Sequence, residues 1–216
     1  MTLNPEIVVR ARRDAALRRA INECDLCVAD GVGVLWAAAR AGHRLPERVP
    51  GVELATEVLA RAGSELPTFL LGGRPDVAAR AADEAQRRWG TTVVGVHDGY
   101  FGEEDEERVT ETVRASGARL VLAGLGERQE AFLHRHRDRL GPATGIGVGG
   151  TLDVLAGVAR RTPAWTRTVG LEWAWRVGGD PRRWHRAPRL LHFAILTLRD
   201  PRGDAGSTTP PPQRRS

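Results

Sequence analysis

The sequence contains no lysine, so arginine supplies all 32 of its basic residues. This absence excludes chemistry that runs through a lysine Schiff base. Cysteine is nearly as scarce. Cys24 and Cys27 form one Cys-x-x-Cys pair, which makes neither a disulfide framework nor a complete zinc site. We therefore expect two buried, unreactive thiols.

Long apolar runs and a leader are also missing. No run approaches the roughly 20 apolar residues of a transmembrane helix. The chain opens on polar and charged residues, where a secretory signal would need an apolar core. These absences predict a cytoplasmic protein whose membrane contact is peripheral.

Positive charge is concentrated in the last quarter of the chain. Residues 160–216 hold twelve arginines and four acidic residues, a local charge of +8 within a total of +5, so the preceding part carries −3. A basic end predicts an anionic partner, and nucleic acid, a lipid surface and a diphosphate all qualify. A solvated tail without a partner is the alternative.

Short apolar runs alternate with amphipathic stretches along the first 160 residues. Strands are expected at 26–29, 68–71, 92–96, 120–123 and 145–148, and helices at 6–22, 34–41, 75–89, 104–116, 129–140 and from 152. This repeated strand–glycine–helix order predicts an α/β fold with a Rossmann-like parallel sheet flanked by helices. Ligands of such sheets bind beyond the carboxyl ends of the strands. The loops there are expected to share one cleft, carrying Asp30, Gly72, Tyr100, Gln129 and Asp153.

Glycine pairs end two of these strands, at Gly72-Gly73 and Gly149-Gly150. Backbone amides at such turns can approach the phosphates of a nucleotide sugar or another phosphate ligand, although a tight turn explains any single pair equally well. Asp30 ends another strand. Its carboxylate is placed either to act as a general base or to cap a turn or helix.

A basic, tryptophan-rich segment follows the expected α/β core. Tryptophans interleaved with arginines precede an apolar run at 190–196, a combination that suits a helix at an anionic membrane interface. The alternative is an ordinary core helix with surface arginines. A single-stranded nucleic-acid site is disfavoured because the apolar residues cluster. We divide the chain into an α/β core at 1–160, a C-terminal helical, membrane-proximal appendage at 161–200 and a disordered tail at 201–216.

Short motifs follow one another in a specific order. They are Thr2-Leu3-Asn4-Pro5-Glu6, Ala29-Asp30-Gly31-Val32-Gly33, Arg48-Val49-Pro50-Gly51, Leu70-Leu71-Gly72-Gly73, Gly99-Tyr100-Phe101, Gly124-Leu125-Gly126 with Gln129-Glu130, Gly147 to Asp153, Arg161-Thr162-Pro163, Gly170-Leu171-Glu172-Trp173, Arg176 and Pro181-Arg182-Arg183. The ordered set resembles the WecG/TagA/CpsF family of glycosyltransferases over nearly the whole chain.

The resemblance implies an inverting enzyme that needs neither metal nor cofactor. It implies a UDP-sugar donor, typically of N-acetylmannosamine or its uronic acid, and a polyprenyl-diphosphate-linked glycan acceptor. The reaction would belong to cell-wall or surface-polysaccharide synthesis at the inner face of the cell membrane. Nucleic acid is not an implied partner, and homo-oligomerisation stays open.

The resemblance also implies roles for individual residues. Asp30 matches the catalytic base, and polar positions lining the cleft match Thr2, Asn4 and Gln129. Positions near the nucleoside match Tyr100 and Asp153. Arginines of the appendage, whose fixed forks of donors suit diphosphates, match Arg176, Arg183 and Arg186.

The chain departs from the family pattern in three places. Family members usually have a further strand and helix before Thr2, so either the start codon is misplaced or the sheet has an unprotected edge and Thr2 an unanchored backbone. The loop before Gln129 is shorter than usual. Thr162 and Leu152 replace an alanine and a phenylalanine. A truncated, non-catalytic protein that binds nucleotide or membrane is therefore the alternative to an enzyme.

Overall fold

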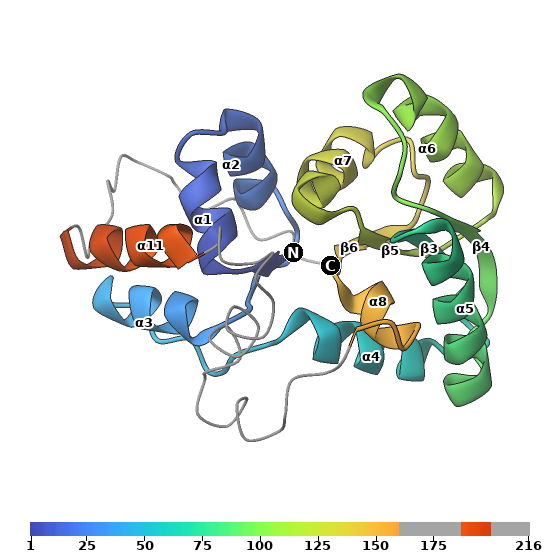
Figure 1. Cartoon of the computed structure of the whole chain (residues 1–216), viewed down its shortest axis with the longest axis horizontal. Helices are drawn as coiled ribbons and strands as arrows, with labels where there is room; N and C mark the ends of the chain where they lie inside the picture. Colours follow the sequence, from blue (N-terminus) through green and yellow to red (C-terminus); the bar gives the residue numbers. More distant parts are fainter. Residues whose placement is uncertain (160–186, 200–216) are drawn as a thin grey trace, which may run out of the picture.

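The computed structural model describes residues 1–159 and 187–199, which form two groups of elements side by side (Figure 1). The larger group contains a four-stranded parallel sheet with helices on both faces. The smaller group contains a two-stranded parallel sheet and the helices at the two ends of the described chain. The expected class, α/β with parallel sheets flanked by helices, is confirmed.

The larger sheet consists of β3 (Thr68–Gly72), β4 (Val93–His97), β5 (Leu120–Gly124) and β6 (Thr144–Gly147). Its spatial order is β4-β3-β5-β6, and every pair is parallel. The chain passes from β3 to β4 on one side and then returns to β5 on the other side of β3. The direction of winding therefore reverses between β3 and β5, where open α/β sheets bind their ligands.

Alternate side chains of these strands enter two separate cores. Leu70 and Leu122 pack with α4 (Gly51–Ala62), α5 (Pro75–Trp89) and α8 (Thr151–Leu155). Phe69 and Val121 pack with α6 (Glu106–Ala115) and α7 (Gln129–His136) on the opposite face. Both faces are covered, as a parallel sheet requires, and the carboxyl edge is held between two packed layers.

The smaller sheet pairs β1 (Thr2–Leu3) with β2 (Val28–Ala29), and Thr2 lies opposite Val28. Around it lie α1 (Pro5–Ala11), α2 (Ala15–Asn22), α3 (Val32–Arg40) and α11 (Ala187–Arg199). Helix α1 packs against α11 and α2, and α11 also contacts α3. The backbone of Thr2 is therefore anchored in a strand, contrary to the alternative that left it unanchored.

Two expectations about the N-terminal part are corrected. The strand near 26–29 pairs with β1 and does not join the larger sheet. The helix expected at 6–22 is two helices, because the Asp14 side chain accepts a 2.9 Å hydrogen bond from the amide of Leu17 and caps a new helix. Helix α4 was not foreseen, although its first residue, Gly51, lies beside the carboxylate of Asp30.

Candidate active site at the strand ends

Glycine turns at the carboxyl ends of the larger sheet pack backbone against backbone. A Cβ atom on Gly72 would lie 2.4 Å from the carbonyl oxygen of Gly124, and one on Gly124 would lie 2.8 Å from that of Gly149. The amide of Gly99 donates to the carbonyl of Gly73 at 2.8 Å. Close packing therefore explains these glycines. It also makes the edge at the winding reversal a surface of main chain, which phosphate groups can approach closely.

Asp30 lies at the junction of the two sheets, beside the start of α4. Its Oδ2 is 3.5 Å from the point where a Cβ atom on Gly51 would lie, and the Thr2 hydroxyl is 3.4 Å from the same point. Gly31, at φ +120°, is the N-cap residue of α3, and Asp30 precedes it. The positive end of the α4 dipole favours a negative charge here.

Gln129 and Thr2 meet at the end of β6. The Thr2 hydroxyl donates to the carbonyl of Gly147 at 3.2 Å. The side-chain carbonyl of Gln129 accepts from the amide of Gly149 at 2.9 Å, and its Nε2 donates to Glu130 Oε1 at 2.6 Å. Both side chains are about 95% buried. Despite the shorter loop before it, Gln129 begins α7 and faces the turn that follows β6.

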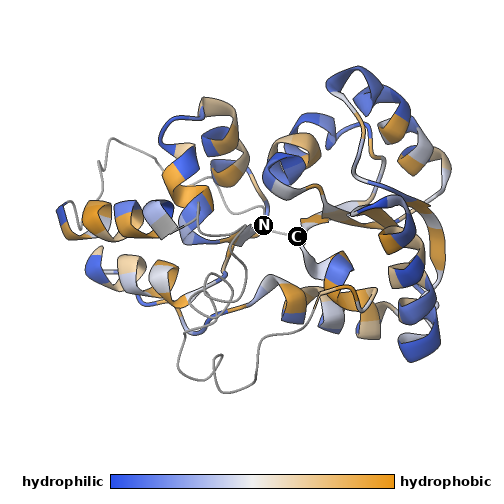
Figure 2. Cartoon of the chain, viewed as in Figure 1, coloured by the Kyte–Doolittle hydropathy of each residue, from blue (hydrophilic) through white to orange (hydrophobic). Residues whose placement is uncertain are grey.

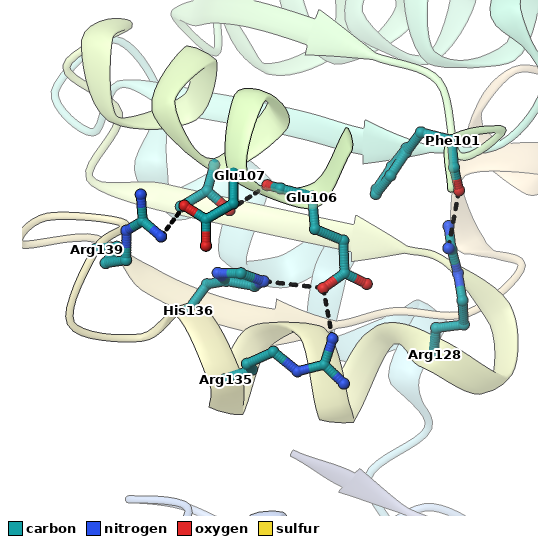
Figure 3. A network of polar contacts seen from close by, with 8 residues as sticks. Phe101, Glu106, Glu107, Arg128, Arg135, His136 and Arg139 are labelled. Carbon is teal, nitrogen blue, oxygen red and sulfur yellow. Dashed lines mark hydrogen bonds and ion pairs between the residues drawn. The ribbon is translucent and has the colours of Figure 1, made fainter. Parts of the chain in front are cut away.

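The loop after β4 is held by Arg128. Its guanidinium donates to the carbonyl of Phe101 at 2.8 Å (Figure 3) and lies 4.7 Å from the centroid of the Phe101 ring. It also donates to the carbonyl of Gly99 at 3.2 Å. Between these two anchors Tyr100 is 75% exposed, while its amide donates to Asp98 Oδ1 at 2.8 Å. A fixed backbone thus presents a tyrosine whose ring is open to a ligand.

The remaining predicted residues are less uniform in placement. Asn4 caps α1, because its Oδ1 accepts from the amide of Ile7 at 3.1 Å. Asp153 stands in the first turn of α8, with Oδ2 3.8 Å from a Cβ atom built on Gly150. The structure brings Asp30, Thr2 and Gln129 to one junction, and it places Tyr100 and Asp153 at turns of the same edge. Outside the described residues lie Arg176, Arg183 and Arg186.

A buried ionic network behind the site fixes α7 against α6. Oε2 of Glu106 lies 2.9 Å from His136 Nε2 and 2.7 Å from Arg135 Nη1 (Figure 3). Glu106 and His136 are both about 95% buried. Sequence reasoning missed the roles of these residues and of Arg128. For the two arginines the reason is that arginine is so frequent in this chain that no single one stands out.

The two thiols differ from expectation. Cys24 is half-buried and Cys27 is exposed, so the expectation of two buried thiols is wrong. Strand β2 begins only at Val28, which leaves Cys27 before the paired segment. Even so, desolvation by the surrounding chain and the neighbouring Cys24 raise the pKa of Cys27 to about 11. The thiol is therefore protonated at neutral pH and is a poor nucleophile.

Among residues 1–159 and 187–199, no three His, Cys, Asp or Glu side chains gather in a way that would hold a metal ion. No helix within the same ranges combines the length and apolar character needed to cross a bilayer.

Helix α11 nevertheless exposes an apolar face. Leu191, Ile195 and Leu198 are 64%, 37% and 57% exposed, and their spacing places them along one side of the helix. The neighbouring α3 exposes Trp36, with the guanidinium of Arg40 5.9 Å from its ring centroid. Figure 2 shows apolar residues along both helices. An exposed apolar face of this kind commonly marks a surface that meets a partner or a membrane.

The fold and this edge define an α/β protein in which a carboxylate, glycine turns and polar side chains meet at the carboxyl ends of parallel strands. A sequence model of the glycosyl transferase WecG/TagA/CpsF family matches residues 1–205. The chain therefore belongs to this family of glycosyltransferases. Membership supports a role in surface-polysaccharide synthesis, and it implies in general terms a nucleotide-sugar donor and a lipid-linked acceptor.

Proposed function

We propose that this chain transfers a sugar, N-acetylmannosamine or a related hexose or uronic acid, from its UDP conjugate to a polyprenyl-diphosphate-linked glycan. The observation that carries the proposal is the position of Asp30. Its carboxylate lies at the N-terminus of α4, beside Thr2 and the end of β6. A carboxylate at the ligand-binding edge of an α/β sheet is placed to accept a proton from a substrate.

The proposed reaction is a single displacement with inversion. The acceptor hydroxyl oxygen attacks the anomeric carbon, the bond from that carbon to the UDP oxygen breaks, and UDP leaves with the bonding electron pair. Asp30 takes the proton of the attacking hydroxyl. The glycine turns and the N-termini of the following helices favour the negative charge that accumulates on the diphosphate.

Hydrogen bonds within the protein limit what each polar group offers the sugar. The Thr2 hydroxyl donates its hydrogen to the carbonyl of Gly147, so it is left to accept a hydrogen bond from a ligand. Asn4 uses Oδ1 to cap α1, which leaves its Nδ2 to donate. In this proposal Tyr100 and Asp153 contact the nucleoside, and the appendage supplies the diphosphate-binding arginines Arg176, Arg183 and Arg186.

The lipid-linked acceptor requires the enzyme to work at a membrane. We propose that the apolar face of α11 lies on the inner face of the cell membrane and that the basic C-terminal part contacts anionic lipid. Each arginine near such a surface contributes about 1 kcal/mol, so several hold a protein without a spanning helix.

Asp30→Asn tests the proposal with little change of shape. In the wild type, UDP release from a panel of UDP-sugars should depend on a short-chain prenyl-diphosphate-sugar acceptor. Acceptor-dependent UDP release by the variant should be about 10²–10⁴-fold slower, while its UDP binding, measured by calorimetry, should be retained. Asp25→Asn, which removes the same charge from an exposed position five residues earlier, should keep full activity.

The contrary outcome supports a protein of a different class. If no donor is turned over, and Asp30→Asn changes neither UDP nor vesicle binding, the chain is a non-catalytic nucleotide- or membrane-binding member of the family. The exposed apolar face of α11 is the observation that favours membrane binding in that case.

A further inference from the structure

A second carboxyl group is buried directly behind Gln129. Glu130 is only 4% exposed. Its Oε1 accepts the 2.6 Å hydrogen bond from Gln129 Nε2. Its Oε2 is shielded from solvent and has no hydrogen-bond partner among the described residues. A buried polar atom without a partner destabilises a fold, so such a group calls for an explanation.

Glu106 shows how the same fold treats a structural glutamate. It is 5% exposed, close to the value for Glu130, and it lies on the helix next to α7. Yet a single one of its oxygens serves both His136 and Arg135. Packing alone therefore does not explain Glu130, because its carboxyl group is buried without ion pairs of the kind that Glu106 makes.

Glu130 and the turn after β6 hold the Gln129 amide from both ends. Nε2 donates to Glu130 and Oε1 accepts from Gly149, so a flip of the amide would break both hydrogen bonds. An amide has two donor hydrogens and two acceptor lone pairs. One hydrogen on Nε2 and one lone pair on Oε1 therefore remain, which matches the donor and acceptor character of sugar hydroxyls.

We propose that Glu130 is a positioning residue that holds the Gln129 amide in one orientation for the donor sugar. This inference rests on the proposed function, since it assigns Gln129 to the sugar. Burial raises the pKa of Glu130, against the opposing effects of the Gln129 hydrogen bond, Arg10 and the terminal amino group. A neutral carboxyl keeps its acceptor oxygen, so the role does not require a charge.

Side-chain amide NMR tests the positioning directly. The glutamines are Gln86, Gln129 and Gln213, and the asparagines are Asn4 and Asn22, so the spectrum is sparse. We expect the Gln129 amide protons to exchange slowly and to shift away from those of exposed Gln86. Glu130→Met should remove this difference, whereas Glu130→Gln, which keeps an acceptor oxygen, should preserve it. An unchanged Gln129 signal in Glu130→Met would overturn the proposal.

Stability separates positioning from a structural role. Glu130→Met removes the unpartnered Oε2 but also the acceptor of the buried Gln129 Nε2, so its Tm should change little. The matched Glu106→Met leaves both His136 and Arg135 without their carboxylate and should lower Tm. Transfer by Glu130→Met should fall about tenfold or more, mainly through a higher KM for the donor, and Glu130→Gln should recover most of it. A lower Tm in Glu130→Met with the donor KM unchanged would show a structural glutamate.

The two readouts also separate this inference from the proposed function. If no donor is turned over by the wild type, the transferase proposal fails, and with it the role of Gln129 toward a sugar. If transfer is present and Glu130→Met moves the Gln129 signal without changing the donor KM, the transferase proposal stands and the positioning role is overturned.

Discussion

At the level of single residues, Glu130 couples the stability of the fold to pH. Desolvation raises its folded-state pKa above the ordinary 4.5. Between the unfolded and folded pKa values, the folded chain holds a proton that the unfolded chain has lost. This contribution to stability is therefore fully present below about pH 4.5 and declines as the pH rises through that window.

Urea unfolding of the wild type and of Glu130→Gln from about pH 4 to about pH 8 measures this coupling. The glutamine does not titrate, so the wild-type stability minus that of the variant should decrease as the pH rises. Other titrating groups are common to both chains and cancel in the difference. A difference that grows with pH would mean that the carboxylate is favoured by the fold, and a constant one would mean that the folded pKa is ordinary.

Among the helices and strands, local chemistry decided which were predictable. The expected helix at 75–89 is confirmed residue for residue, because Pro75 starts α5 and Gly90 ends it at φ +65°. The helix expected at 6–22 is broken because Asp14 caps a second helix, a competition that apolar periodicity does not reveal. Strand β1 has two residues and exists only through its pairing with β2, a contact distant in sequence.

The sequence predicted where the glycines of the candidate site lie better than it predicted the contacts that they make. Glycines were expected at the ends of the strands, and they lie there. Their main reason, contact between the backbones of Gly72, Gly124 and Gly149, depends on the spatial order of strands and is invisible in the sequence. Two further features likewise depend on the folded arrangement of the loops and cannot be read from the sequence. They are the hydrogen bonds from Arg128 to two backbone carbonyls and the unpartnered oxygen of Glu130.

Helix α11 supports a prediction about membrane binding. Leu191→Ser combined with Leu198→Ser removes two exposed leucines from one face, where they contribute little to the core. The affinity for anionic vesicles in co-sedimentation should fall tenfold or more, because each exposed leucine adds about 1.5–3 kcal/mol when it is fully buried in an apolar phase and about 1.4 kcal/mol is already a factor of ten.

Leu26→Ser is the control, since Leu26 is 67% exposed but lies in the loop before β2. It should leave vesicle binding unchanged. Equal losses in both variants would point to general apolar adsorption, and no loss in the double variant would remove α11 from the membrane surface.

Across the whole molecule, Glu127 links the two groups of elements. Its carboxylate forms an ion pair with Arg189 of α11 and lies 3.6 Å from Arg10 Nε of α1. Arg10 also donates to the backbone carbonyl of Glu127 at 2.6 Å. Glu127 is two residues before Gln129, so the segment from 127 to 130 contacts α1, α11, the loop after β4 and the turn after β6. Movement of α11 would therefore reach the proposed sugar-binding amide through this segment.

Reversal of charge at this position tests the link. Glu127→Arg places a third cation beside Arg10 and Arg189, and the repulsion should loosen α11. The carboxylate is 58% exposed, so the free energy of unfolding should fall by only about 1 kcal/mol. Amide hydrogen exchange in 187–199 should accelerate far more than in α5, and transfer activity should fall because Gln129 is displaced.

The matched control is Glu57→Arg, which reverses one charge of the exposed pair with Arg61 on α4. It should change neither exchange in α11 nor transfer. Adding Arg189→Glu to Glu127→Arg restores opposite charges in reversed order, and protection of α11 should return in part. If α11 exchanges at the wild-type rate in Glu127→Arg, packing of α11 on α1 holds the two groups together without the ion pair, and the segment from 127 to 130 does not transmit its movement.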